Sequence, residues 1–164
     1  MKIKKPTLKK QFTIDESRFD FQGYNTMNKE FILEVKSVPI AKYIDDYDKN
    51  LKKIDYSTFD FNQKIALFPV GFQKKKYDVI SERALKHLKH LENLKKQNNE
   101  LLTYICYVIQ RKDVKEFQAS QIDPTYKSTL KNVNENGVQI ITIVVDWKAN
   151  GNCIFVTDTL TVLL

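Results

Sequence analysis

The sequence predicts a single α/β domain in which helices flank a mixed central sheet. Two short strands open the chain within residues 18–38, and nearly continuous apolar runs at 101–109 and 139–145 indicate buried strands. Helical patterns occupy residues 81–98 and 124–136. Helices alternating with buried strands are typical of layered α/β architectures. A chain of 164 residues with 42% hydrophobic content is long enough to form one domain with a substantial core.

The formal net charge of +7 is concentrated at the N-terminus. Residues 1–10 contain five lysines and no acidic residue, and the rest of the chain carries 22 Lys and Arg against 20 Asp and Glu. We therefore expect residues 1–16 to be a basic, solvated lead-in and residues 17–164 to be the domain, with an insertion around 41–76. No apolar run approaches the ~20 residues that span a bilayer, and no signal-peptide pattern is present. A cytoplasmic protein without membrane contact is expected.

The first two strands are predicted to form a β-hairpin. Arg18–Phe21 and Phe31–Val38 are the strands, and the polar stretch 22–30 between them contains turn-forming glycine and asparagine.

Three charged side chains of this hairpin can converge. Side chains two residues apart on a strand share a face, so Asp20 can meet Glu34 and Lys36 if the strands pair. Two carboxylates can hold a hard divalent cation, and a neighbouring ammonium group can steady a phosphate or an attacking water. Alternatively, the three residues form an ion-pair ladder across the hairpin. Spacing alone favours the ladder, because Glu-x-Lys is a common pattern.

The clearest helix is predicted from Ser81 to Asn98. Leucines at one per turn form its apolar stripe: Leu85, Leu88, Leu91 and Leu94. His87 and His90 lie mainly on the other flank, where surface histidines are common.

The second half of the chain alternates strands and helices. Leu101–Ile109 is apolar on both faces, which predicts a strand in the middle of a sheet. Asp113–Phe117 is predicted as a short helical turn, and Asp123 with Pro124 as the start of another helix. Cys153–Leu164 supplies the last strand. Its Cys153, like Cys106, is expected to be a buried free thiol.

Several motifs in this order resemble one known family. The motifs are Ser17-Arg18-Phe19-Asp20-Phe21, Glu34-Val35-Lys36-Ser37-Val38, the stretch Asp78–Leu88, Gln110-Arg111-Lys112-Asp113-Val114, and Ile122–Tyr126. Together they resemble the C-terminal domain of the sugar fermentation stimulation (SfsA) proteins. Family members also carry an N-terminal barrel of the oligonucleotide-binding type, for which residues 1–16 leave no room.

The resemblance implies a restriction-endonuclease-like PD-(D/E)XK core, which cuts phosphodiester bonds with magnesium or manganese. It reverses the preference for an ion-pair ladder. Asp20 and Glu34 would bind the metal together with the backbone carbonyl of Val35, and Lys36 would position or deprotonate the attacking water. The residues implied to contact nucleic acid are Arg18, Arg83, Lys86 and His87.

Two functions follow from the resemblance. The first is metal-dependent hydrolysis of nucleic acid, with DNA as the expected partner. The alternative is a non-catalytic DNA-binding or regulatory module on a nuclease scaffold, because Leu85 and Ala84 stand where the family's helix motif has glutamine and glycine. The sequence leaves a homodimer or a partner chain open.

Overall fold

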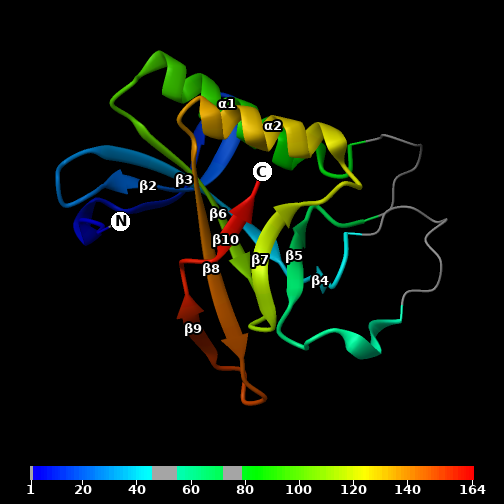
Figure 1. Cartoon of the computed structure of the whole chain (residues 1–164). Coiled ribbons are helices and arrows are strands. Elements are labelled where there is room, and N and C mark those ends of the chain that lie inside the picture. The colour runs from blue at the N-terminus through cyan, green and yellow to red at the C-terminus, as the bar shows by residue number, and fades with distance from the viewer. Residues whose placement is uncertain (1, 46–54, 72–78) are drawn as a thin grey trace. The chain divides into compact units, whose positions relative to one another are not determined.

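The computed structural model describes residues 2–45, 55–71 and 79–164, and the chain divides into two compact units (Figure 1). Unit 1 consists of Met1–Lys36, Ser81–Cys106 and Thr129–Ile141. Unit 2 consists of Ser37–Ile80, Tyr107–Ser128 and Thr142–Leu164.

The predicted hairpin is present in the structure. Its strands are β2 (Ser17–Tyr24) and β3 (Glu30–Val38), which pair in antiparallel fashion from Tyr24↔Glu30 to Phe21↔Leu33. Both strands extend beyond the predicted limits, so the turn shortens to residues 25–29. The side chain of Asn25 closes this turn by accepting the backbone N–H groups of Met27 and Lys29, each at 2.9 Å.

A strand also forms where the sequence predicted a solvated lead-in. Strand β1 (Lys9–Ile14) follows the short 3₁₀ turn η1 (Lys5–Thr7) and pairs antiparallel with β2 from Lys9↔Gln22 to Ile14↔Ser17. Most of its side chains are exposed. An edge strand of this kind buries little on either face, and therefore it shows no apolar alternation in the sequence.

The first long helix, α1 (Glu82–Gln97), begins where predicted, with the Ser81 hydroxyl accepting the Ala84 N–H at 3.4 Å. The predicted leucine stripe is only half buried: its middle members are buried, and its end members, Leu85 and Leu94, are intermediate. A spacing of three residues falls short of the 3.6-residue turn, so successive leucines rotate away from the core. The buried face instead consists of Ala84, His87, Leu88 and Leu91.

Unit 2 contains a four-stranded mixed sheet in the order β10-β7-β5-β4. Strand β7 (Val114–Ala119) runs parallel to both neighbours, β5 (Lys64–Phe68) and β10 (Thr161–Leu163), whereas β4 (Ala41–Lys42) is antiparallel to β5. The predicted helical turn at Asp113–Phe117 is therefore wrong. Backbone pairing on both sides of β7 outweighs the local helical signal.

An aromatic cluster forms the core of unit 2. Tyr107 stacks on Phe117 with ring centroids 4.2 Å apart, and its hydroxyl lies 2.6 Å from that of Tyr126. Tyr126 belongs to α2 (Pro124–Glu135), whose N-terminus is capped as predicted, because Asp123 accepts the Tyr126 N–H at 2.8 Å.

The six-stranded sheet has the order β1-β2-β3-β6-β8-β9. The predicted central strand is β6 (Leu102–Ile109), and the apolar run after α2 is β8 (Gln139–Trp147). The final stretch splits into β9 (Cys153–Thr157) and β10. This mixed α/β architecture confirms the predicted fold class.

The two cysteines differ. Cys106 is a buried free thiol, and burial raises its pKa to about 11. Cys153 is free but exposed, so the expectation that it is buried is wrong, because β9 lies at the end of the sheet.

The expected insertion around 41–76 contains β4, the 3₁₀ turn η2 (Tyr56–Thr58) and β5. Its residues 46–54 and 72–76 lie outside the described part of the chain. The proposed domain limits stay a prediction. Within the described residues, none of the helices is both long enough and apolar enough to traverse a lipid bilayer.

Candidate active site

The candidate site lies where β2 and β3 stop pairing through their backbones. The last backbone-paired residues are Phe21 and Leu33, and beyond them the Asp20 carboxylate, not a backbone carbonyl, bonds to β3. Asp20 Oδ2 accepts the Val35 N–H at 2.8 Å. The half-buried Asp20 carboxylate is therefore one hydrogen bond from the peptide unit that joins Glu34 to Val35.

Glu34 is the buried centre of the site. The residue is 3% exposed, and one carboxylate oxygen, Oε1, lies 2.6 Å from Lys36 Nζ and 2.5 Å from His87 Nδ1. The other oxygen, Oε2, is buried and has no hydrogen-bond partner among the described residues. Buried carboxylate oxygens are normally paired, so Oε2 is positioned to accept a ligand.

Electrostatics keep Glu34 ionised. Burial alone raises the pKa of this carboxyl, but the hydrogen bonds from His87 and Lys36 outweigh burial, so the pKa lies below its usual value. An ionised carboxylate only accepts hydrogen bonds, which assigns a proton to His87 Nδ1. The network is thus a buried anion neutralised at one oxygen only.

His87 is a site residue that sequence reasoning placed differently. It was expected on a surface flank and, from the resemblance, at nucleic acid, but it is 3% exposed and turned to Glu34. Its ring lies 5.5 Å from that of Phe19, which is fully buried on β2. Its spacing from Ala84 and Leu91, at three and four residues, is the sequence signal that could have revealed it.

Two expected nucleic-acid contacts, Arg18 and Arg83, lie at the surface. Arg18 on β2 is exposed and donates a hydrogen bond to the Gln11 side chain on β1. Arg83 on α1 is exposed and forms no hydrogen bond or ion pair with any described residue. Both guanidinium groups are thus accessible to an anionic partner.

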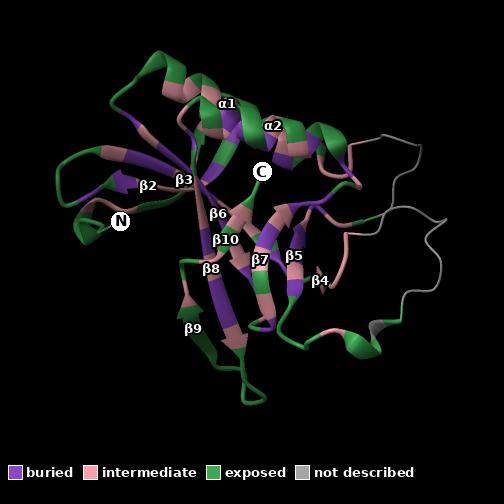
Figure 2. Ribbon diagram, in the orientation of Figure 1, coloured by how far each residue is buried: buried purple, intermediate pink, exposed green. Residues whose placement is uncertain are grey.

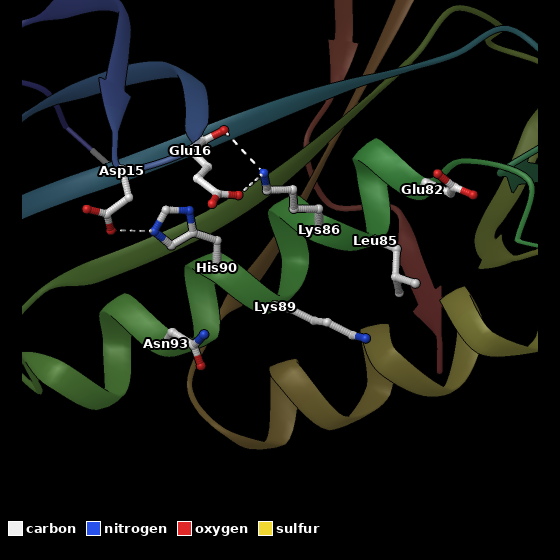
Figure 3. A pocket seen from close by; sticks show the side chains of 8 residues that line it. All are labelled: Asp15, Glu16, Glu82, Leu85, Lys86, Lys89, His90 and Asn93. Carbon is white, nitrogen blue, oxygen red and sulfur yellow. Dashed lines mark hydrogen bonds and ion pairs between the residues drawn. The ribbon is translucent and has the colours of Figure 1, made fainter.

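Lys86 lines a groove formed by α1 and the β1–β2 turn, and its side chain points to Glu16 (Figure 3). Lys86 Nζ lies 2.7 Å from Glu16 Oε2, and His90 Nε2 lies 3.4 Å from Asp15 Oδ2. The hydrogen bond from Lys86 lowers the pKa of the Glu16 carboxyl. The groove measures about 460 Å³, and its lining residues do not include those of the Glu34 site. Asp15 and Glu16 of the β1–β2 turn therefore contact His90 and Lys86 of α1.

The donor set fits a hard divalent cation. Within the described residues no three His, Cys, Asp or Glu side chains form a metal cluster. Magnesium, however, takes one or two carboxylates and keeps several waters. Asp20 and Glu34 supply oxygen donors, and the unpartnered Oε2 is the oxygen that such an ion would satisfy.

Comparison with known proteins gives a consistent family. The family model described as "Sugar fermentation stimulation protein RE domain" matches residues 56–151. A sugar fermentation stimulation protein homolog from Desulfotalea psychrophila is 32% identical over 124 residues, covering 74% of this chain and 48% of the relative. A homolog from Clostridium kluyveri is 27% identical over 158 residues, covering 96% of this chain and 55% of the relative.

A solved structure agrees with these matches. The structure of Pyrococcus furiosus SfsA in complex with Ca²⁺ has a TM-score of 0.69 and 21% identity, and the match covers 96% of this chain and 55% of that one. The likeness shows the shared fold. The chain spans about half the length of the curated relatives that it matches.

Proposed function

The chain belongs to the sugar fermentation stimulation protein (SfsA) family, and we propose that it is a magnesium-dependent nuclease that hydrolyses phosphodiester bonds in DNA. The observation that carries the proposal is the unpartnered, buried Oε2 of Glu34, on a residue whose other oxygen bonds to Lys36 and whose following peptide N–H bonds to the Asp20 carboxylate. The combination of Asp20, Glu34 and Lys36 on one hairpin is what the family resemblance implies for a PD-(D/E)XK site.

Asp20 and Glu34 would hold the metal, with the carbonyl of Val35 as the third protein donor that the resemblance implies. A bound Mg²⁺ or Mn²⁺ polarises the scissile phosphate, lowers the pKa of a bound water and offsets the charge that develops during attack. That the Pyrococcus furiosus relative was solved with Ca²⁺, another cation bound by oxygen ligands, supports this assignment.

The remaining residues act on charge and position. The amino group of Lys36 contacts Glu34 Oε1, and its side chain is 12% exposed. It can orient the attacking water, or, once Lys36 itself is deprotonated, accept a proton from that water. His87 fixes the orientation of Glu34 through Oε1 and leaves Oε2 without a hydrogen bond from any described residue. In the reaction the attacking water would give up a proton to Lys36 or to solvent, its oxygen would form a bond to phosphorus, the bond to the leaving sugar oxygen would break, and that oxygen would take up a proton from solvent.

Cleavage of linear and circular DNA, with and without Mg²⁺, tests the proposal. We expect metal-dependent cleavage by the wild type and a loss on the order of 10³ in rate for Asp20→Ala, since removing about 4 kcal/mol of transition-state stabilisation has that effect. Asp158→Ala is the control, because Asp158 is an exposed aspartate outside the site. Cleavage that survives Asp20→Ala, or no cleavage by the wild type with either metal, would contradict a nuclease role.

A non-catalytic DNA-binding module is the second candidate. The observation that favours it is that Lys36 and His87 both bond to Glu34 Oε1, because a carboxylate paired in this way can serve a purely structural ion network. DNA binding of equal strength with and without Mg²⁺, and without cleavage, is the expected result for this alternative.

A further inference from the structure

The β8–β9 hairpin in unit 2 carries a group of exposed apolar side chains. This hairpin patch consists of Trp147, Ile154, Phe155 and Val156, whose exposed fractions range from 45% for Val156 to 60% for Phe155. Figure 2 shows the exposure along β9. Strand alternation places Trp147, which pairs with Cys153, on the same face as Phe155, and Ile154 on the other face, so apolar side chains are exposed on both faces of this hairpin. Groups of exposed apolar side chains mark contact sites for other molecules.

Strand β9 is an end strand of the six-stranded sheet and lacks protection against pairing. It pairs with β8 and is the last strand in the sheet order. None of its five residues is charged, whereas β1, the strand at the other end, carries exposed Lys9 and Lys10. Lysines on an edge strand prevent pairing with further strands, and an uncharged apolar edge permits it. A register shift opposite Val156 leaves Cys153–Phe155 as the regular part of this edge.

We propose that the occupant of this edge is a second copy of the chain, with the two β9 strands pairing antiparallel about a two-fold axis. Such an interface is self-complementary, because each copy contributes the same three-residue segment, Cys153–Phe155. Charge selects this edge for self-association. Each copy has a formal net charge of +7, so two copies meet most favourably where no like charges face one another. Pairing through β1 would bring lysines against lysines.

The area of the hairpin patch predicts a weak dimer. With aromatic side chains offering 150–250 Å² each, the four partly exposed side chains would bury on the order of 400 Å² per copy. Adding the paired backbones, the two copies together bury roughly 1,000 Å², which is the low end for a specific interface. The dimer should therefore form with rising concentration and separate on dilution.

The single tryptophan of the chain allows a direct test, because it is Trp147 of the hairpin patch. We would follow sedimentation equilibrium and tryptophan emission of the whole chain from low micromolar to several hundred micromolar protein. The expected result is a mass that rises towards two copies, with a blue shift of the emission over the same range. Phe155→Lys should raise the dissociation constant at least tenfold and suppress the shift.

Met27→Lys is the matched control. Met27 lies in the β2–β3 turn of unit 1, is 74% exposed, and gains the same charge on substitution. It should associate as the wild type does. Ile154→Lys serves as a second variant if circular dichroism shows that Phe155→Lys does not fold. A mass of one copy with constant emission over the whole range would overturn the proposal, as would association that both β9 variants leave unchanged.

Discussion

Glu34 on β3 and His87 on α1, 53 positions apart in the chain, meet with 2.5 Å between Oε1 and Nδ1 and with each side chain only 4% exposed. This buried pair joins the hairpin to the helix. It leaves one oxygen of Glu34 hydrogen-bonded and the other without a described partner.

Removing the His87 imidazole should weaken metal binding at the Glu34 site. We expect His87→Ala to lower the affinity for Mn²⁺ by about 10- to 100-fold, as losses of groups that orient a metal ligand usually do. His87→Asn keeps an N–H donor near Nδ1 and should restore part of the affinity. Titration calorimetry measures both. The control is His90→Asn on the same helix, because His90 contacts exposed Asp15 instead. Equal affinities for all four proteins would show that His87 only fills space.

Lys86 should contribute one phosphate contact despite its bond to Glu16. Exposed ion pairs are weak because solvent and salt screen them, so a phosphate can replace the carboxylate. For Lys86→Ala we expect the slope of log affinity against log salt for duplex DNA to fall by roughly one. Lys29→Ala is a close control, because the Lys29–Glu100 pair in unit 1 has nearly the same exposure as Lys86–Glu16. If both variants change the slope alike, Lys86 has no special role.

The same contact makes Glu16 a competitor of DNA. Glu16→Gln removes the carboxylate that holds Lys86, so DNA affinity at low salt should rise by up to about fivefold, the value of a surface ion pair. Glu100→Gln adds the same net charge elsewhere in unit 1 and should produce a smaller rise. Fluorescence anisotropy with labelled duplex DNA compares them. An equal rise in DNA affinity for Glu16→Gln and Glu100→Gln would mean that only the net charge of the chain affects binding.

A buried ion cluster in unit 2 should make stability depend on acid pH. Asp113 accepts bonds from Arg111 Nη2 at 2.6 Å and Lys64 Nζ at 2.7 Å, and the bonds from Arg111, followed by that from Lys64, hold its pKa well below the usual range. A depressed folded-state pKa adds stability above the unfolded-state value of about 3.9, and this contribution is lost as pH falls below it.

Asp113→Asn should therefore cost about 2 kcal/mol of unfolding free energy at neutral pH, the usual worth of a hydrogen bond to a charged group. The difference from wild type should narrow progressively below about pH 4, where the unfolded wild type takes up a proton. Urea unfolding across this pH range measures it, with Asp158→Asn as an exposed control. A difference that stays constant with pH would mean that the cluster stabilises through packing alone.

The sequence predicted those elements whose local chemistry was unambiguous. The alternation of side chains predicted β2 and β3. The capping residues Ser81 and Asp123 predicted where α1 and α2 begin. The burial of His87 was missed because leucines spaced by three residues suggested the wrong helix face.

Strands stabilised by distant partners were harder to predict. β7 was mistaken for a helical turn because its pairing with β5 and β10 joins segments far apart in the chain. β1 was missed because its exposed lysines resemble a solvated terminus. In the candidate site, strand parity suggested the Glu34–Lys36 contact, but the Asp20–Val35 bond depends on where the ladder ends, which no spacing encodes.

The central claim is that Asp20 and Glu34 together hold a divalent metal ion, and calorimetric titration of Mn²⁺ and Mg²⁺ into wild type and Asp20→Asn tests it most directly. Asparagine keeps an oxygen to accept the Val35 N–H, so the fold should survive while the charge is lost. We expect one metal ion per chain for the wild type and for the Asp158→Asn control, and at least a 100-fold weaker metal affinity for Asp20→Asn, which corresponds to about 2.7 kcal/mol. Equal metal affinity in wild type and Asp20→Asn, or no binding by the wild type, would contradict it.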